Sequence, residues 1–447
     1  MSTPTSATTP TTTSGATWTN WGRNQTCHPA EVVVPRDVDE LRATLARAHT
    51  RGIPVRAVGS GHSFAPVAVT DGLQLRLDHL AGTTAFDAEA ARVTVGAGTP
   101  LHVLNPALQA LGLALPNLGD IDRQTISGAI STGTHGSGLR RQGIASAVVG
   151  LTLALADGSL LRCSADVEPE VFAAARVGLG ALGVITEVEL QCVPAFRVHA
   201  KEFTADLAEV LATVDDDVRA HDHVDMHWFP HTPRVLVKHN DDVGADDPGR
   251  VLPAWREKLD DDVLSNGFFE LVNRVATRAP RIVPRLAQVT ARTLSDREFT
   301  GESWRVFCSP RRVRFREMEY AVPLTSFVPV VTELRAWIDS HDVSLPFPVE
   351  LRFTGADDIW LSTAHERDNA YVAVHQYHRL DDGGVFAAFE AIVAEHAGRP
   401  HWGKLHTLGA DQLRALYPRF DDFRMVRDRL DPDRTFTSDH VRHLLGD

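Results

Sequence analysis

Short apolar runs of strand type alternate with helical patterns and glycine-rich turns from residue 18 to about residue 195. Residues 37–52 predict an amphipathic helix, because Asp37 can cap its first turn and Gly52 can end its last. A second helix is predicted from Thr99, and a hairpin is predicted to turn at Asp157-Gly158. Strands are predicted for AEVVVP at 30–35, PVRAVG at 54–59, LQLRLDHL at 73–80, ARVTVGAG at 91–98 and VITEVEL at 184–190. This alternation indicates an α/β or α+β domain.

The pattern changes at about residue 196 to longer strands and longer amphipathic helices. The runs that predict an antiparallel sheet are HVDMHWFP at 223–230, RVLVKHN at 234–240, SWRVFCSP at 303–310, REMEYAVP at 316–323, PVELRFTG at 348–355 and AYVAVHQYH at 370–378. Helices are predicted at 324–341 and 383–398, on one side of that sheet. Residues 241–300 are less periodic and predict helices near the surface. We therefore expect a second domain at 196–418 and a helical segment at 419–447.

Composition narrows the class of protein. The 447 residues carry a formal net charge of -13, which argues against nucleic acid or an anionic membrane as a partner. The four cysteines, Cys27, Cys163, Cys192 and Cys308, have no metal-type spacing and predict reduced thiols in a cytoplasmic protein. No apolar run approaches the roughly 20 residues that span a bilayer, and no secretory signal is evident. Residues 1–17 are rich in Ser, Thr and Pro, and predict a disordered tail.

Two glycine-rich segments are candidates for cofactor binding. In GSGHS at 59–63, glycine permits positive φ, and successive N–H groups can then converge on a phosphate. LPNLGDIDRQTISGAISTGTHGSG at 115–138 is long and polar with interleaved apolar residues, as in an ordered functional loop. GLGALG at 178–183 matches a dinucleotide pattern, but a helix precedes it and a strand follows, so a Rossmann site is not predicted.

Several polar side chains of the second half are candidates for chemistry. Glu350 and Arg352 fall on one face of a strand and could offer an acceptor and a guanidinium fork to a polyhydroxylated ligand, although an ordinary ion pair is the alternative. Lys404, in RPHWGKLH, is either a surface lysine or a fixed charge in a site. His223, Asp225 and His227 share a strand face, where a polar sheet floor explains them more simply than a metal.

Taken in order, six segments resemble the aldonolactone and alditol oxidoreductases of the vanillyl-alcohol-oxidase flavoprotein superfamily. The segments are VRAVGSGHSFAPVAVTDG, LPNLGDIDRQTISGAISTGTHGSG, GLGALGVITEVELQCVP, FPHTPRVLVKHN, VELRFTGADDIWLS and RPHWGKLHTL. The resemblance implies an α+β fold, with a PCMH-type FAD-binding domain at 18–195. It also implies an antiparallel-sheet substrate domain, or cap, flanked by helices at 196–418. The segment 419–447 then packs back near the FAD domain.

The resemblance also implies the cofactor and its contacts. FAD is expected to be joined covalently to His62 through the flavin 8α-methyl group. The residues expected to hold FAD are Gly59, Ser60, Gly61, His62, Ser63, Asn117, Gly119, Asp120, Thr125, Gly128, Ala129, Ser131, Gly133, His135, Ile185 and Lys404. Asp120 departs from the alditol oxidases, which carry serine there. No metal is implied.

By the same resemblance, Glu350, Arg352, His375 and Lys404 are the catalytic residues. Lys404 is expected near the flavin N1/C2=O region, Arg352 beside the substrate oxygen, and His375 as proton acceptor, while Glu350 accepts hydrogen bonds from substrate hydroxyls. The expected reaction is hydride transfer to FAD from a carbinol of an aldono-1,4-lactone such as L-gulono-1,4-lactone.

Three alternatives remain open at this point. The first is an alditol oxidase that converts xylitol or sorbitol to an aldose and H2O2. The second is a flavoprotein of the same fold with another pocket, and the third is a sugar-binding protein without redox chemistry. Gly119 leaves an oxygen route open and favours O2 as electron acceptor, but a dehydrogenase with another acceptor is compatible with it. A small polyol or sugar lactone is the expected partner, without nucleic acid or membrane insertion.

Overall fold

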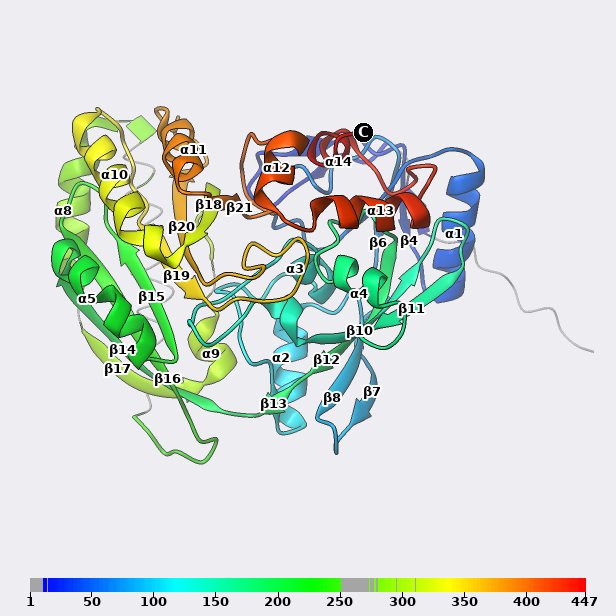
Figure 1. Cartoon of the computed structure of the whole chain (residues 1–447), viewed down its shortest axis with the longest axis horizontal. Helices are drawn as coiled ribbons and strands as arrows, with labels where there is room; N and C mark the ends of the chain where they lie inside the picture. Colours follow the sequence, from blue (N-terminus) through cyan, green and yellow to red (C-terminus); the bar gives the residue numbers. More distant parts are fainter. Residues whose placement is uncertain are drawn as a thin grey trace, which may run out of the picture.

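The computed structural model describes residues 11–13, 15–250, 273, 277–278, 280–294, 296–309 and 311–447. Figure 1 shows a first domain beside a second domain, which is built on one large sheet. One hydrophobic cluster contains buried residues of both, from Val33 to Leu445. The interface between the domains is therefore packed as a core, and side chains from both can meet in one site.

The first domain contains two principal sheets. A four-stranded sheet has the order β1 (Thr11–Thr13), β4 (Glu31–Val34), β6 (Leu73–Arg76) and β5 (Val55–Val58). An antiparallel sheet has the order β11 (Leu160–Ser164), β10 (Val148–Ala154), β12 (Val184–Gln191), β8 (Arg92–Gly96) and β7 (Thr83–Asp87). Short pairs join β2 (Trp18–Thr19) to β3 (Thr26–Cys27) and β9 (Leu113–Ala114) to β13 (Val193–Pro194).

The helices of the first domain include α1 (Val38–Thr50), α2 (Leu101–Ala110), α3 (Ile126–Ser131) and α4 (Pro169–Ala175). The predicted cap is present, because the Asp37 side chain accepts a hydrogen bond from Glu40 N at 2.8 Å. Strands β4, β6 and β5 are parallel, so their carboxyl ends lie at one edge of the sheet. The GSGHS turn follows β5 at that edge.

The second domain contains an eight-stranded antiparallel sheet. Its strand order is β17 (Arg297–Glu302), β14 (Arg197–Asp206), β16 (Arg234–Val243), β15 (His223–Trp228), β19 (Val349–Thr354), β20 (Asn369–Tyr377), β18 (Phe315–Pro323) and β21 (Arg399–Pro400). The helices are α5 (Leu207–Ala220), α8 (Val283–Thr293), α9 (Ser303–Phe307), α10 (Phe327–Ser340) and α11 (Val385–Glu395). Figure 1 shows α5, α10 and α11 on the outer face of the sheet, so its other face is turned toward the first domain.

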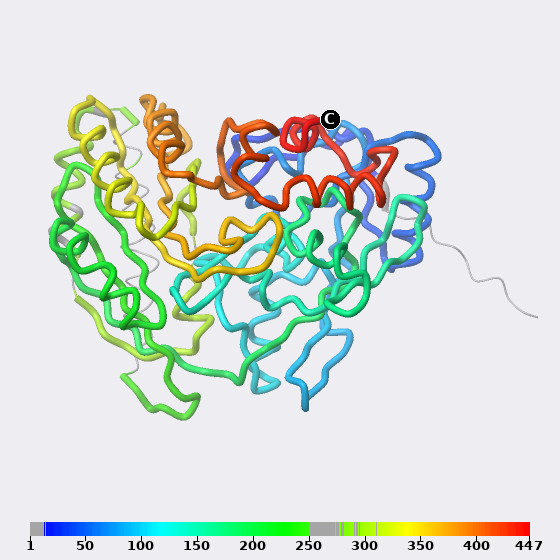
Figure 2. Tube along the Cα trace, viewed as in Figure 1, coloured from blue at the N-terminus to red at the C-terminus, as the bar shows by residue number. Residues whose placement is uncertain are grey.

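The C-terminal segment returns to the first domain (Figure 2). It contains α12 (Ala410–Leu416), α13 (Phe420–Leu430) and α14 (Asp439–Leu445). Helix α13 contacts α4, and Val55 N of β5 donates to Thr435 O at 2.7 Å. The strand that leads into the GSGHS turn is thus held by the end of the chain.

The second glycine-rich segment connects the domains. Gly138, at a φ of +121°, donates its N–H to Phe353 O of β19 at 2.6 Å. Ser137 Oγ donates to Val224 O of β15 and accepts from Phe353 N. The loop from the first domain therefore rests directly on the central strands of the second, next to Arg352.

Several elements differ from the prediction. SWRVFCSP, predicted as a strand, contains helix α9, because a short apolar run has no periodicity that separates strand from helix. Within the region predicted to hold helices, residues 297–300 belong to the edge strand β17, and β14 was not predicted. Thr11–Thr13, placed in the disordered tail, pair with β4, whereas residues 1–10 and 14 lie outside the described residues. The four cysteines are free thiols, as predicted.

Candidate active site

The GSGHS turn forms one wall of a pocket in the first domain. Gly61 has a φ of +69°, a left-handed conformation that glycine adopts without strain. Gly59 has no room for a side chain, because a Cβ there would lie 2.3 Å from Thr125 Oγ1. The imidazole of His62 lies against Trp21, with ring centroids 5.5 Å apart. The turn can therefore present its backbone at close range to a bound group.

Nine of the residues expected to hold FAD line this pocket together. They are Gly59, Ser60, Gly61, His62, Ser63, Thr125, Gly128, Ser131 and Ile185. The lining also includes Trp18, Arg56 and Gln124, which the sequence did not identify as binding residues. Backbone amides and hydroxyls form a donor set that suits a diphosphate, and the arginine adds a positive charge to the wall. The pocket thus fits the dinucleotide part of FAD.

The GLGALG segment is not a Rossmann turn, because α4 precedes it and β12 follows it. It nevertheless lines the same pocket through Leu179, Gly180 and Gly183. The segment is thus not a dinucleotide motif, as the sequence predicted, but it contributes to the pocket, which the sequence did not predict.

The other residues expected to hold FAD lie outside this lining. They are Asn117, Gly119, Asp120, Ala129, Gly133, His135 and Lys404. Asn117 donates its side-chain N–H to Gln142 O at 3.0 Å and accepts from Leu118 N, so it braces the second glycine-rich loop. Ala129 is fully buried in α3. Asp120, His135 and Lys404 lie among charged side chains at the boundary between the domains.

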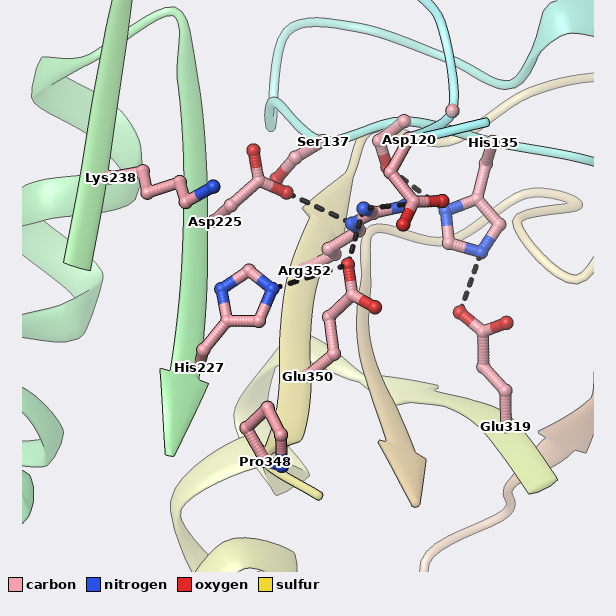
Figure 3. Close-up of polar contacts among 12 residues, drawn as sticks. Asp120, His135, Ser137, Asp225, His227, Lys238, Glu319, Pro348, Glu350 and Arg352 are labelled. Atoms are coloured by element: carbon pink, nitrogen blue, oxygen red, sulfur yellow. Dashed lines mark hydrogen bonds and ion pairs between the residues drawn. The ribbon is translucent and has the colours of Figure 1, made fainter. Parts of the chain in front are cut away.

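Acidic and basic side chains lie next to one another on the inner face of the large sheet and in the loops that pack on it. We call this network the charged floor, and its members are Asp225, His227, Glu317, Glu319, Glu350, Arg352 and His375 of the sheet, with Lys404 and His135 of the loops. Glu350 and Arg352 are two residues apart on β19 and share a face, as the sequence predicted. Arg352 forms an ion pair with Glu350, and its Nε lies 2.9 Å from Asp225 Oδ1 of β15 (Figure 3). The carboxyl group of Glu350 lies 3.9 Å from both His227 and His375. The predicted acidic and basic pair therefore belongs to a larger network.

His375 and Lys404 meet through a carboxylate that the sequence did not single out. Glu317 of β18 lies opposite His375 of β20, and its Oε1 is 3.4 Å from His375 Nε2. Its other oxygen accepts from Lys404 Nζ at 2.5 Å. His375 Nδ1 lies 3.2 Å from Pro348 O, and a carbonyl can only accept, so Nδ1 carries a proton. In the neutral imidazole, Nε2 is then the atom that can take a proton.

The floor continues past Lys404 to His135. Lys404 Nζ is 3.7 Å from Glu319 Oε2. The other oxygen of this carboxylate, Glu319 Oε1, is 2.9 Å from His135 Nε2 (Figure 3). Tyr371 stacks on the His135 ring, with centroids 3.6 Å apart. Glu317 and Glu319 alternate along β18, so a strand pattern of the type applied to β19 could have found them.

His135, Glu319 and His401 could in principle hold a metal ion. Their ligand atoms lie within 4.8 Å of one another, the one such group of three in the part of the chain that the structure describes. The ammonium group of Lys404 already places a positive charge beside Glu319, and a second cation there would be repelled. We therefore assign no metal to this group.

Asp120 contacts cationic side chains of the second domain. Arg311 Nη2 is 2.5 Å from its Oδ2, and Arg352 Nη2 is 3.9 Å from its Oδ1. Its backbone carbonyl accepts from Ser309 N at 2.8 Å. The carboxylate that replaces the serine of alditol oxidases is thus paired across the domain boundary.

The three polar residues that share one face of β15 contact two different groups of residues. Asp225 and His227 border Arg352 and Glu350, so they belong to the charged floor. His223, the first residue of β15, lies apart from them: its Nδ1 is 2.7 Å from Ser137 O, and its Nε2 is 3.1 Å from Asp242 Oδ1. The stripe is therefore a polar sheet floor, the simpler of the two interpretations of the sequence.

A cavity of about 480 Å³ opens beside Arg352. Its lining combines charged and polar side chains, among them Asp120, Asp225, His227, Lys238, Arg311 and Arg352. A lining of this kind can hydrogen-bond a hydroxyl-rich ligand in many directions.

Burial and the neighbouring charges shift the pKa values along the floor. Burial disfavours the charged forms of His375 and Lys404, but the facing carboxylates outweigh it and raise both pKa values. Burial also opposes ionisation of Glu317, yet Lys404 and His375 outweigh it and lower its pKa. Burial raises the pKa of Glu350 in spite of Arg352. Burial, assisted by Lys404, lowers the pKa of His62 to about 4, so this imidazole is neutral at pH 7.

Comparisons with known proteins agree with this geometry. A family model described as D-arabinono-1,4-lactone oxidase matches residues 188–444, and an FAD-binding domain matches residues 29–164. L-gulono-1,4-lactone dehydrogenase of Mycobacterium tuberculosis (strain ATCC 25618 / H37Rv) is 39% identical over 431 residues, covering 96% of this chain and 99% of the relative. L-gulonolactone oxidase of Mus musculus is 33% identical, and alditol oxidase of Streptomyces sp. is 31% identical; each alignment covers 96% of this chain and 98% of the relative.

Solved structures share the fold. Cholesterol oxidase from B. sterolicum superposes with a TM-score of 0.82 at 19% identity over 99% of both chains. Chitooligosaccharide oxidase superposes with a TM-score of 0.69 at 14% identity over 94% of this chain and 93% of that one. No helix in the described ranges is long and apolar enough to cross a membrane. The domain matches and the aligned relatives show that the chain belongs to the D-arabinono-1,4-lactone oxidase family of FAD-dependent oxidoreductases.

Proposed function

We propose that this protein oxidises a carbinol of an aldono-1,4-lactone such as L-gulono-1,4-lactone. The observation that carries the proposal is the Glu350–Arg352 pair beside His375, in which Arg352 also lines the polar cavity. A lactone ring with free hydroxyls needs several donors and acceptors at fixed positions, and the charged floor supplies both. The 39% identity to a protein named for L-gulono-1,4-lactone favours a lactone over an alditol.

We assign each floor residue a role that its contacts support. Glu350 accepts hydrogen bonds from substrate hydroxyls, and Arg352, held by Glu350 and Asp225, donates to the reacting oxygen. His375 Nε2 takes the hydroxyl proton, and Glu317 stabilises the imidazolium that forms. Lys404, paired with Glu317 and Glu319, would supply a fixed positive charge for hydride transfer to bound FAD. Bound FAD supplies the hydride acceptor.

His62 is the residue proposed to join FAD covalently. Its imidazole lines the pocket and is neutral at pH 7, so a ring nitrogen has a free lone pair for the bond. Acid precipitation tests this proposal. We expect the yellow colour to stay with the precipitated protein and to be released from the His62→Ala variant. Colour released from the unchanged protein would exclude the covalent bond.

The substrate is tested by anaerobic mixing of the holoenzyme with L-gulono-1,4-lactone, L-galactono-1,4-lactone, xylitol or sorbitol. We expect the lactones to bleach the flavin absorbance fastest. Bleaching by xylitol alone would make the protein an alditol oxidase, which is the second candidate, supported by the 31% identical relative. Admission of air then reports the acceptor, because a rapid return of colour with formation of H2O2 identifies O2 as the electron acceptor.

A cytoplasmic location, inferred from the reduced cysteines, stays a prediction.

A further inference from the structure

Arg56 is a buried arginine that lies in the wall of the nucleotide pocket. It is 3% exposed, belongs to β5 and lines the pocket a few residues before the GSGHS turn. Among the described residues, the groups that accept its hydrogen bonds are all backbone carbonyls. The positive charge is therefore not balanced by a neighbouring carboxylate, which is unusual for a buried guanidinium.

The five N–H donors of Arg56 are all used within the protein. Nε and Nη2 donate to Val67 O at 2.9 and 2.6 Å, and Nη2 also donates to Leu179 O at 2.7 Å. Nη1 donates to Gly180 O at 3.0 Å and to Phe436 O at 3.2 Å. Arg56 thus joins three distant segments, and no donor remains to bind a ligand directly. It can act on a ligand only through its charge and through the wall that it holds in place.

A comparison with Arg352 shows what is missing around Arg56. Arg352 is surrounded by carboxylates, which outweigh burial and raise its pKa. Burial alone lowers the pKa of Arg56 to about 10, so its guanidinium stays charged at pH 7 without compensation. An anion bound beside Arg56 would supply that compensation.

The pocket needs such a cation. Arg56 is the one arginine or lysine among the lining residues of the described chain, and His62 is neutral at pH 7. The acidic lining residue, Asp78, is already paired with Arg76 at 2.6 Å. Without Arg56, a diphosphate in this pocket would meet neutral polar groups but no positive charge.

We propose that Arg56 is the fixed counter-charge for the diphosphate of FAD and the positioning residue of the pocket wall. The GLGALG segment then has a role, because it offers two of the carbonyls that hold the guanidinium. Gly180 has a φ of +62°, and a Cβ there would lie 3.4 Å from Arg56 Nη2. Glycine at this position lets the segment turn closely around the guanidinium.

The test uses the His62→Ala background, in which flavin binding is reversible. FAD and riboflavin, which lacks phosphate, are titrated into the apoprotein, and binding is followed by quenching of flavin fluorescence. We expect Arg56→Gln to raise the Kd for FAD about 10- to 100-fold while the Kd for riboflavin changes less than about threefold. High salt should narrow the difference between the two proteins.

Arg399 provides the matched control. Arg399 is 6% exposed, against 3% for Arg56, and its guanidinium also donates to backbone carbonyls, those of Thr363, His365 and Leu416, but it does not line the pocket. Arg399→Gln should lower the melting temperature without changing the ratio of the two Kd values. An equal loss of FAD and riboflavin in Arg56→Gln, or no loss of FAD, would overturn the proposal.

A conservative variant covers the case in which Arg56→Gln does not fold. Arg56→Lys keeps the charge but has only three donors for the wall. It should melt at a lower temperature and keep the ratio of the FAD and riboflavin Kd values within about threefold of the parent. If the Kd for FAD relative to that for riboflavin rises tenfold or more in this variant, the charge is not what selects FAD.

Discussion

The nucleotide pocket and the charged floor are built from different kinds of polar group. The pocket is built from backbone and hydroxyl groups around one unpaired guanidinium, that of Arg56. The floor is built from alternating carboxylates and cations, from Asp225 through Arg352 and Lys404 to His135. A backbone cradle depends on local conformation, whereas a charge network depends on every member being present. Pocket variants should therefore alter retention of FAD, and floor variants should alter stability and the reductive step.

Loss of Arg352 should have the largest effect. In Arg352→Leu, Glu350 and Asp225 remain buried without their guanidinium, which costs about 3–5 kcal/mol in the free energy of unfolding. Reduction of the flavin by substrate should become undetectable, while FAD stays bound. Urea unfolding, flavin absorbance and anaerobic mixing measure the three quantities. Arg162→Leu, which breaks an exposed pair with Glu189, should cost less than about 1 kcal/mol. A stable Arg352→Leu would contradict the interpretation of the floor as one network.

Lys404→Met should lower the rate of flavin reduction about 10²- to 10³-fold, because a fixed charge near the reacting centre is lost. FAD should remain bound, since Lys404 does not line the nucleotide pocket. Stopped-flow bleaching under anaerobic conditions gives the rate. Lys201→Met, at an exposed position of β14, is the control and should reduce at the normal rate. If Lys404→Met bleaches nearly as fast as the unchanged protein, the role of Lys404 is wrong.

Gly59→Ala tests whether the backbone conformation of the nucleotide pocket is needed to retain FAD. A Cβ there would lie 2.3 Å from Thr125 Oγ1, and the displacement of the turn should cost about 1–3 kcal/mol. We expect a lower content of FAD in the purified protein, with a normal reduction rate in the fraction that holds it. Gly72→Ala creates an equally close contact, with Pro54 O at 2.3 Å, outside the pocket. It should lower the melting temperature with full FAD content. Equal FAD loss in both variants would make the effect one of general stability.

Glu317→Gln should have the smallest effect, a shift in pH dependence. The proton acceptor must be neutral, so the reduction rate should rise as the pH rises through the pKa of His375. The carboxylate of Glu317 raises that pKa, and its removal should move the acid limb to lower pH. Rates from about pH 5 to about pH 9 measure the shift. Glu333→Gln removes the carboxylate of an exposed pair with His396 and should leave the profile unchanged. An unmoved profile in Glu317→Gln would exclude His375 as the titrating group.

The same unfolding experiments have a defined pH dependence. Glu317 has a lowered pKa in the folded protein, so its contribution to stability is present above the ordinary range of a glutamate and is lost as the pH falls through the folded value. His375 has a raised pKa, so its contribution is present below the ordinary histidine value and is lost as the pH rises through the folded value. The contribution of Glu317 should disappear in Glu317→Gln, and that of His375 should become smaller, because only Glu350 then raises its pKa.

Local sequence patterns correctly predicted those structural features that depend only on neighbouring residues. The cap at Asp37, the hairpin at Asp157-Gly158 and the shared face of Glu350 and Arg352 follow from rules that act over a few residues. The same rules failed at residues 303–308, because an apolar run of that length fits a strand and a helix equally well. They also overlooked Glu317 and Glu319, whose importance depends on a partner, Lys404, far along the chain.

The amino-acid sequence by itself determined the glycine-rich turn, the histidine within it and the strand that carries Glu350 and Arg352. These features depend on the backbone freedom of glycine and on the alternation of side chains along a strand, and neither requires a distant contact. Only the tertiary structure decided which charges are neighbours: that Glu317 lies between His375 and Lys404, and that Arg56 reaches Val67, Gly180 and Phe436. Electrostatic interactions depend on distance in space and on burial, and both arise when segments far apart in the chain pack together.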